Sequence, residues 1–323
     1  MLAYKAADYQ AVFDYFGIDA GDRPAESCYA YAPVFRTAVA GVRAAVKRTR
    51  RSPVAAAAIA RWVSALAASG IPVVTPIEAP VQDPGLIGDG MWVAYPWIDG
   101  RVYDGSDADI AAAGDLLGRI HARTDYFDAA MPRFKWPEHD EASVQEDIDD
   151  LSRVLKSRAP EIALQVVGRT GPWHRTFMTD TLPAIRDSAL PFIAGTTDFK
   201  AGNLVYTATG PVLIDPDNAD YLPRVLDLAI AALLFHNDLK TAPPRLFTQA
   251  EWAVFDKAYS AHAKLTDLEV ELWPTALQYM ISEWGTWTLV AADEWDDWAD
   301  PHNRTFLADL ATADPARFTL SAT

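Results

Sequence analysis

The segment TTDFKAGNLVYTATGPVLIDPD, residues 196–217, decides the fold that we expect for this chain. Asp198 and Asn203 stand five residues apart in a loop, and Asp215 follows twelve residues after Asn203. The segments 203–206 and 211–214 flank a turn that ends at Gly210, which is typical of a short hairpin. Such a hairpin brings Asn203 and Asp215 to the same end, so one site can use both side chains.

These three residues are of the types that phosphoryl transfer requires. One carboxylate orients the attacking hydroxyl and accepts its proton, while an amide oxygen and a second carboxylate hold Mg²⁺ against the phosphate oxygens. Mg²⁺ prefers hard oxygen ligands, which Asn and Asp supply. The pattern therefore favours magnesium-dependent phosphate transfer. The alternative is that Asp198 and Asn203 only form hydrogen bonds within a turn.

The segment resembles the catalytic loop and metal-binding segment of the aminoglycoside phosphotransferase and choline kinase-like family, which is related to protein kinases. The family pattern is Asp-x-x-x-x-Asn, followed by a strand and Ile-Asp-x-Asp, and the chain matches it from Asp198 to residue 217. The resemblance implies that Asp198 is the catalytic base. It also implies that Asn203 and Asp215 bind magnesium and that Lys200 faces the γ-phosphate.

Two segments near the N-terminus add to the resemblance. The strand that ends near Lys47 resembles the one whose lysine grips the α- and β-phosphates, although a lysine at a strand end is otherwise an ordinary edge residue. Residues 93–100 resemble the hinge between the lobes of a kinase. The resemblance implies that backbone groups at Tyr95, Trp97 and Ile98 read the edge of the adenine base.

The residues that support the catalytic loop differ in part from the family pattern. We interpret His121 and Asp227 as structural, with Asp227 tying down the loop as in the family. The family usually has His-Gly before the catalytic Asp, and here Thr196 and Thr197 stand in those places. This departure puts the geometry of the loop in doubt more than its chemistry.

Two further departures concern the nucleotide. The predicted helix 53–69 contains no Asp or Glu, so the usual partner of the strand lysine is missing. We expect Lys47 to be held by Glu78, by the region of Asp215 or directly by phosphate. Residues 27–35 contain no glycine where a phosphate-covering loop would lie. Together these gaps keep open a catalytically silent relative that binds nucleotide.

The order of the predicted elements indicates two lobes. A hairpin at 34–46, an amphipathic helix that begins after Ser52 and an apolar strand at 91–97 come first. Beyond them the pattern is mainly helical, except for short strands within 191–214. We expect an α+β, bilobal, protein kinase-like fold with a small β-rich N-terminal lobe and a larger, mainly helical C-terminal lobe. The two lobes are predicted to cover residues 1–98 and 99–323.

The segment 283–300 is the candidate wall for the acceptor, because it combines four tryptophans with six acidic residues. Tryptophan faces stack on sugars, bases and cations, and carboxylates bind ammonium groups. We therefore predict that Trp284, Trp287, Asp293 and Asp297 contact an acceptor. Binding by the two carboxylates would suit an acceptor with a positive charge. The alternative is a helix with tryptophans on a core face and acids on a wet face.

The composition restricts the partners and the compartment. The formal net charge of −16 disfavours nucleic acid and anionic membrane as partners. The acidity serves solubility, the attraction of a cationic substrate, or both. No apolar stretch is long enough to span a membrane. Cys28 is the only cysteine, so an internal disulfide and a cysteine zinc cluster are excluded, and a cytoplasmic location is expected.

The sequence thus predicts an enzyme that transfers phosphate from ATP or GTP to a small-molecule hydroxyl, with Mg²⁺ as the cofactor. The preferred acceptor is an antibiotic, so that phosphorylation confers resistance. A metabolic kinase for an amino alcohol or a sugar is the first alternative, and the silent nucleotide-binding relative is the second. The expected partners are a nucleoside triphosphate and a small acceptor, without nucleic acid or membrane.

Overall fold

The first apolar segments of the chain form an antiparallel sheet. In the computed structural model, which describes residues 4–29, 31–79, 86–88 and 90–321, its strands lie in the order β1-β2-β4-β3. Gly41 has a φ of 79° at the turn between β1 and β2, a conformation that glycine adopts without strain. The predicted hairpin and third strand are confirmed, and the second strand runs three residues further than expected. The strands are β1 (Val34–Val39), β2 (Val42–Thr49), β3 (Leu86–Ile87) and β4 (Gly90–Pro96).

A short helix covers one face of this sheet and closes a small core. The chain enters it through a 3-10 turn, Ala6–Tyr9, and continues as α1 (Gln10–Tyr15). The rings of Phe13 and Phe35 meet edge to face, with centroids 5.1 Å apart. Aromatic pairs of this geometry contribute about 1 kcal/mol beyond the area that they bury. The sheet is therefore anchored by its own aromatic cluster.

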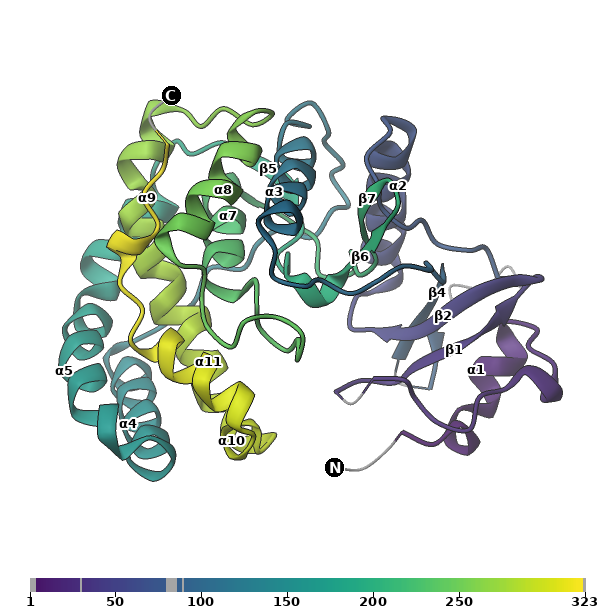
Figure 1. Cartoon of the computed structure of the whole chain (residues 1–323), viewed down its shortest axis with the longest axis horizontal. Helices are drawn as coiled ribbons and strands as arrows, with labels where there is room; N and C mark the ends of the chain where they lie inside the picture. Colours follow the sequence, from purple (N-terminus) through teal and green to yellow (C-terminus); the bar gives the residue numbers. More distant parts are fainter. Residues whose placement is uncertain (1–3, 30, 80–85, 89, 322–323) are drawn as a thin grey trace.

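Helix α2 (Pro53–Ala68) joins the sheet to the rest of the molecule. It begins as the sequence predicts, because the Ser52 side chain accepts a hydrogen bond from Ala55 N–H and proline occupies the first turn. Its apolar face, which includes the fully buried Trp62, packs into the large core of the helical part. Figure 1 shows α2 between the sheet and the helices. The helix thus couples the two parts of the fold.

The larger part is built from helices around one core. Helix α7 is buried along its whole length, so it forms the centre of this core. Helices α3 and α8 pack closely, because a Cβ atom at Gly118 would lie only 2.5 Å from Tyr259 O. The helices are α3 (Asp107–His121), α4 (Glu141–Arg158), α5 (Pro160–Thr176), α6 (Leu182–Arg186), α7 (Arg224–Leu234), α8 (Gln249–Ser260), α9 (Asp267–Met280), α10 (Thr286–Glu294) and α11 (Pro301–Ala311).

Two small strand pairs lie between these helices and hold the segment with which the sequence analysis began. Strand β5 (Phe192–Gly195) pairs with β8 (Asp220–Pro223), and β6 (Leu204–Thr207) pairs with β7 (Gly210–Leu213). The hairpin of β6 and β7 lies beside α2 (Figure 1), where Val73 bridges to Leu213. The strands predicted within 191–214 are confirmed, whereas β8 was not predicted.

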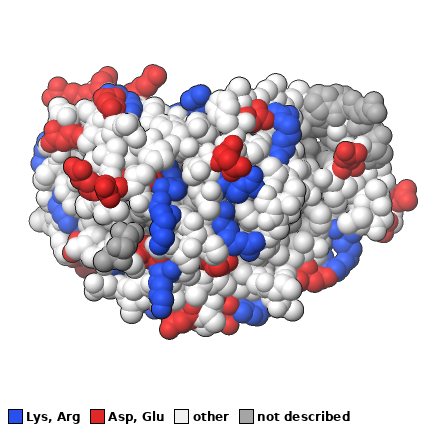
Figure 2. All heavy atoms as spheres, turned by 90° about the horizontal axis from the view of Figure 1, so that it is seen from above, with Lys and Arg blue, Asp and Glu red and all other residues white. Residues whose placement is uncertain are grey.

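The distribution of surface charge and the character of the helices are relevant to the predictions about nucleic acid and membrane. On the face seen in Figure 2, Lys and Arg side chains lie among Asp and Glu side chains, so the acidic residues do not form a continuous coat there. In the described part of the chain, no helix combines the length and the apolar character needed to cross a membrane. The predicted division into a small sheet-containing part and a larger helical part is confirmed.

Candidate active site

The loop between β5 and β6 brings Asn203 against Asp198. The side-chain amide of Asn203 donates hydrogen bonds to the Asp198 backbone oxygen at 2.8 Å and to its carboxylate Oδ2 at 3.1 Å. The Asn218 amide donates to the same Oδ2 at 3.2 Å. These bonds use the N–H groups of Asn203, so its Oδ1 is the atom that can bind a metal. They also hold the Asp198 carboxylate in one orientation.

The hairpin of β6 and β7 sets the relation between Asn203 and Asp215. Its register pairs Leu204 with Leu213, and the Ile214 N–H donates to Asn203 O at 2.9 Å. Asn203 and Asp215 therefore flank the same open end of the hairpin. This is the juxtaposition that a shared metal site requires.

Lys47 reaches this end of the hairpin from β2. Its ammonium contacts the carboxylate of Asp215 and lies 3.2 Å from Asp217 Oδ2. Burial lowers the pKa of Lys47, but Asp215 and Asp217 outweigh this effect and raise it above its ordinary value. Of the partners expected for Lys47, the structure shows the region of Asp215 and not Glu78. The missing acid of α2 is thus replaced from the opposite part of the fold.

Asp217 is a site residue that the sequence analysis did not single out. Its carboxylate is buried and accepts a hydrogen bond from the Tyr95 hydroxyl at 2.5 Å. Burial raises the pKa of Asp217, while the neighbouring Lys47 opposes this shift. The Ile-Asp-x-Asp pattern was the signal that could have found it, because Asp217 is its second acid.

The donor groups at this end of the hairpin fit a magnesium ion. Mg²⁺ is usually held by one or two carboxylates together with water and substrate phosphates. Asp215 and Asn203 Oδ1 supply protein oxygens of this kind, and the buried Asp217 Oδ2, 3.2 Å from the Lys47 ammonium, adds a second carboxylate nearby. Among the described residues, no group of three His, Cys, Asp or Glu side chains could enclose a metal on its own. The site therefore suits an ion whose coordination a phosphate completes.

One of the groups predicted to read the edge of the adenine base, the backbone N–H of Trp97, already has a partner. Its backbone N–H donates to Arg43 O at 2.8 Å, because β4 remains paired with β2 up to this point. That N–H is therefore not available to a base. The side chain of Tyr95 is directed to Asp217, and the Arg36 guanidinium lies 4.5 Å from the centre of the Trp97 ring. Ile98, the next residue, stays a prediction.

Lys200, in the loop between β5 and β6, lies between two carboxylates. Its ammonium is 3.4 Å from Asp198 Oδ1 and 3.1 Å from Asp238 Oδ2. Burial lowers the pKa of Lys200, but Asp198 and then Asp238 raise it above its ordinary value. Burial raises the pKa of Asp198, and the charge of Lys200 opposes this. Asp238 was not predicted, since it lies 38 residues from Lys200 in the sequence.

Asp227 supports the catalytic loop from helix α7. Its fully buried carboxylate accepts hydrogen bonds from the backbone N–H groups of Thr196 and Thr197, both at 2.7 Å, and contacts His121 Nε2 at 2.9 Å. Thr197 has a φ of 51°, in the left-handed region where the family usually has glycine. The interpretation of Asp227 as the support of the loop agrees with these contacts.

We expect Asp227→Ala to lower the free energy of unfolding by about 3 kcal/mol, because two buried N–H groups and His121 would lose their acceptor. Urea unfolding measures the change. Asp115→Ala is the matched control, since Asp115 also pairs with a histidine, His262, but both side chains are exposed. Equal stability of the two variants would contradict the proposed support.

A cavity of about 230 Å³ lies beside Asp238. Trp287 and Asp297, two of the four residues predicted to contact an acceptor, line it together with residues from both parts of the fold. Two tyrosines come from the segment before β1 and Arg50 follows β2. The other residues come from the loop after α7, from α10 and α11, and from the chain between these two helices. The residues that matter below are Tyr29, Tyr31, Asp238, Trp287, Trp295 and Asp297.

Trp284 and Asp293 do not line this cavity, which corrects the predicted grouping. Asp293 forms an ion pair with Arg158 Nε of α4 at 2.6 Å, so its carboxylate ties two helices together. Trp284 lines a second cavity of about 750 Å³, next to Tyr279 and Glu283. The sequence grouped four residues that the structure divides between three surroundings.

The segment before β1 reaches across to the helical part. The Tyr31 hydroxyl donates to Asp297 Oδ1 at 2.8 Å, and the rings of Tyr31 and Trp295 meet with centroids 5.5 Å apart. Asn303 donates to the same Asp297 oxygen at 3.0 Å. One wall of the cavity therefore belongs to the N-terminal part, and the hydrogen bond from Tyr31 to Asp297 joins it to the opposite wall.

A sequence profile of the phosphotransferase enzyme family matches residues 32–274. The chain belongs to this family. The match spans both parts of the fold and includes every residue from Lys47 to Asp238 described above, so the predicted resemblance is confirmed and the protein is a phosphotransferase. No curated protein sequence matches the chain.

Solved structures of phosphotransferases share the fold at low sequence identity. An aminoglycoside phosphotransferase from Alicyclobacillus acidocaldarius subsp. acidocaldarius DSM 446 is 18% identical with a TM-score of 0.57, and the match covers 94% of this chain and 95% of that one. An amicoumacin kinase in complex with AMP-PNP, Ca²⁺ and Ami is 17% identical with a TM-score of 0.63, covering 97% and 94%. A spectinomycin phosphotransferase in complex with ADP and spectinomycin is 14% identical with a TM-score of 0.61, covering 97% and 98%. The kinase-like, bilobal fold is thereby confirmed.

Proposed function

We propose that this phosphotransferase moves the γ-phosphate of ATP or GTP onto a hydroxyl group of a small molecule. The observation that carries the proposal is the meeting of three groups from separate elements. Lys47 of β2 contacts Asp215 after β7, and Asn203, at the same end of the hairpin, contacts Asp198. A positive charge for phosphate, oxygen ligands for a metal and a carboxylate base thus lie together between the proposed lobes, residues 1–98 and 99–323.

Each residue has one task in this reaction. The Asp198 carboxylate accepts the proton of the acceptor hydroxyl. The oxygen of that hydroxyl bonds to the γ-phosphorus, and the bond from the γ-phosphorus to the oxygen that bridges to the β-phosphate breaks. Lys47 binds the phosphates next to the γ-phosphate, and Lys200 faces the γ-phosphate itself. Mg²⁺, held by Asn203 and Asp215, would neutralise charge on the phosphate oxygens. Positioning and charge neutralisation then supply most of the rate gain.

The cavity between Tyr31 and Trp287 is the proposed acceptor pocket. It lies next to Asp238, which contacts Lys200 beside the base. Its aromatic rings offer faces for stacking, and Asp238 and Asp297 offer negative charge to an ammonium group. An antibiotic that carries amines is the preferred acceptor. An amino alcohol or a sugar remains the alternative, because the same groups would bind them.

The contacts of the loop and of Lys47 favour an active enzyme over a silent nucleotide-binding relative. Two of the departures that suggested a silent protein have a local replacement. Asp215 and Asp217 stand in for the missing acid of α2, and Thr196 bonds to the supporting Asp227 through both its N–H and its hydroxyl. Since the reaction consumes a nucleoside triphosphate, we place the protein in the cytoplasm.

A mass-spectrometric screen tests the proposed function. The protein is incubated with Mg²⁺ and either ATP or GTP in the presence of aminoglycoside, peptide and nucleoside antibiotics, amino alcohols and sugars. The expected result is one class of acceptor that gains a phosphoryl group. The Asp198→Asn variant is run beside it to exclude a contaminating kinase. Binding of magnesium nucleotide with neither transfer to an acceptor nor slow transfer to water would favour the silent relative.

The Tyr31 hydroxyl gives a prediction for the acceptor pocket. We expect Tyr31→Phe to raise the KM of the acceptor about fivefold, because one hydrogen bond that closes the pocket is lost while the ring remains. The KM of the nucleotide should stay unchanged. Steady-state kinetics measure both constants, and Tyr126→Phe serves as a control because this residue lies outside the pocket. An unchanged KM for the acceptor would remove Tyr31 from the pocket.

A further inference from the structure

Lys200 is shared between Asp198 and a second carboxylate whose role the reaction above leaves open. The ammonium lies slightly closer to Asp238, at 3.1 Å, than to Asp198, at 3.4 Å. The Lys200 side chain is only 15% exposed, and that of Asp238 only 26%. In such surroundings charges interact more strongly than in water. Asp238 therefore competes effectively for the lysine.

The loop that carries Asp238 is held in place from several sides. Asp238 follows α7 with a φ of 63°, a left-handed conformation that Asp tolerates better than most residues. Two residues before it, His236 contacts Arg245 O at 2.7 Å through Nδ1 and the Tyr103 hydroxyl at 2.9 Å through Nε2. These contacts fix the first turn of the loop and, with it, the position of Asp238.

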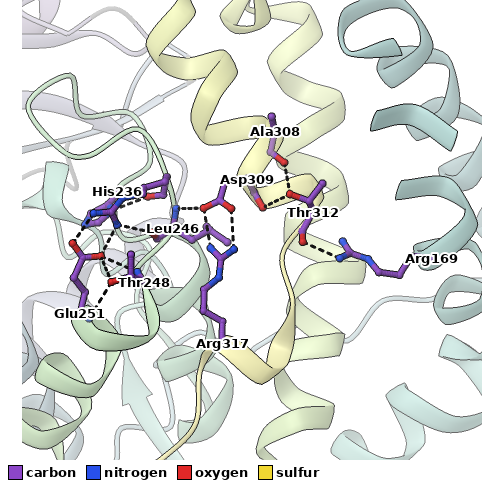
Figure 3. Close-up of polar contacts among 10 residues, drawn as sticks. Arg169, His236, Leu246, Thr248, Glu251, Ala308, Asp309, Thr312 and Arg317 are labelled. Atoms are coloured by element: carbon purple, nitrogen blue, oxygen red, sulfur yellow. Dashed lines mark hydrogen bonds and ion pairs between the residues drawn. The ribbon is translucent and has the colours of Figure 1, made fainter. Parts of the chain in front are cut away.

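The far end of the same loop is also anchored. Figure 3 shows the contacts there: Leu246 N–H donates to Asp309 Oδ2 at 2.9 Å, and Arg317 donates to both oxygens of Asp309. Arg245 binds Glu251 Oε1 at 2.7 Å. The loop is thereby tied to α8 and α11. A carboxylate on such a support can hold a partner at a fixed point.

The geometry of an ammonium group explains why a second acceptor matters. Lysine carries three N–H donors. With two of them directed to Asp198 and Asp238, the third can face an incoming phosphate. Without Asp238, Asp198 would be the only carboxylate of the described residues in an ion pair with Lys200, and the ammonium would move toward it. The lysine would then no longer reach the phosphate.

We propose that Asp238 is a positioning residue for phosphate transfer: it holds the Lys200 ammonium away from Asp198 and directs it toward the γ-phosphate. This inference rests on the proposed function. It assigns a role to a residue outside the segment 196–217, and that residue acts on the transfer step through Lys200. Asp238 also lines the acceptor pocket, so a direct contact with the acceptor is the competing explanation.

A double-mutant cycle separates these two explanations. The slow hydrolysis of ATP is measured for wild type, Asp238→Asn, Lys200→Met and the double variant. No acceptor is added, so contacts with an acceptor do not affect the rates. We expect Asp238→Asn to lower kcat about tenfold in the wild-type background and less than twofold in the Lys200→Met background, because the effects of coupled residues do not add. Asn adopts the left-handed conformation at position 238 as readily as Asp does, so Asp238→Asn should keep the structure of the loop.

The control and a second measurement keep the inference testable even if no turnover is found. Lys240→Met removes another lysine of the same loop, which pairs with Asp300 at 2.5 Å, and it should leave ATP hydrolysis unchanged. The ratio of the affinities for magnesium ATP and magnesium ADP reports the γ-phosphate contact without any transfer. Asp238→Asn should lower this ratio about threefold, and Lys200→Met should lower it at least as much.

Two outcomes would overturn the proposal. One is an effect of Asp238→Asn on hydrolysis that is as large without Lys200 as with it. The other is an unchanged ATP-to-ADP affinity ratio in Asp238→Asn. A protein that binds both nucleotides with the expected ratios but transfers phosphate to nothing would contradict the proposed function and leave the role of Asp238 supported.

Discussion

Asp198→Asn should lower kcat at least about a hundredfold while the affinity for magnesium nucleotide stays within about threefold of wild type. The substitution removes the negative charge that accepts the hydroxyl proton and keeps the size of the side chain. An amide oxygen at this position can still accept the bond that Asn203 donates to Oδ2. The loop should therefore keep its shape, so the loss falls on the transfer step.

Initial rates with the acceptor found in the screen, together with a nucleotide titration, measure the two effects separately. Asp187→Asn is the matched control, because Asp187 lies near β5 in an exposed ion pair with Arg186. Its rate should equal that of wild type. A rate for Asp198→Asn within a few-fold of wild type would show that another group accepts the proton, and the proposed mechanism would have to be abandoned.

The parts of the fold that follow from local pattern could be predicted from the sequence. The β1–β2 hairpin and helix α2 carry their own signals, which are a glycine turn, the Ser52 cap and an apolar face. Strand β8 carries none, since residues 220–223 become a strand only by pairing with β5. Helix α4 begins at a capping box on Asp140, and its apolar residues are spaced among many acids, so its apolar face is less plain in the sequence than that of α2.

The grouping of the three side chains at the candidate site was predictable for a similar reason. Asp198, Asn203 and Asp215 are close in sequence, and a short hairpin is enough to gather them. Asp238 and Tyr31 meet their partners across 38 and 266 residues, so that only the folded chain brings them to the site. No periodicity in a single sequence carries that information.

The prediction of one acceptor wall from the segment 283–300 was wrong in part, because this segment is not one regular helix. A π-helical turn, Ile281–Gly285, changes the register between Trp284 and Trp287, so the two rings face different cavities. Helix α10 then ends at Glu294, and Asp296 takes a left-handed conformation with a φ of 58°. The chain turns there, which separates Asp297 from Asp293. Helical spacing therefore could not group these side chains correctly.

Asp215→Asn should abolish most of the magnesium dependence of nucleotide binding. The substitution removes the charge from the residue that lies opposite Asn203 at the end of the hairpin and that contacts Lys47. Metal affinity depends on a deprotonated carboxylate, since an amide oxygen is a weaker ligand for Mg²⁺. We expect the affinity for ATP in saturating Mg²⁺ to fall about thirtyfold, while the affinity measured in EDTA changes little because Asp217 still holds Lys47 at 3.2 Å.

A titration of Mg²⁺ at fixed nucleotide distinguishes a lost metal ligand from a displaced lysine. If Asp215 binds the metal, the variant should need far more Mg²⁺ and show no change in EDTA. If Asp215 only orients Lys47, the affinity should fall equally with and without Mg²⁺, and the metal assignment would be wrong. Asp128→Asn, which removes the charge from a surface partner of Arg61, should leave both curves unchanged. The two curves are decisive because Lys47 and the metal bind the same phosphates but only one of them responds to the chelator.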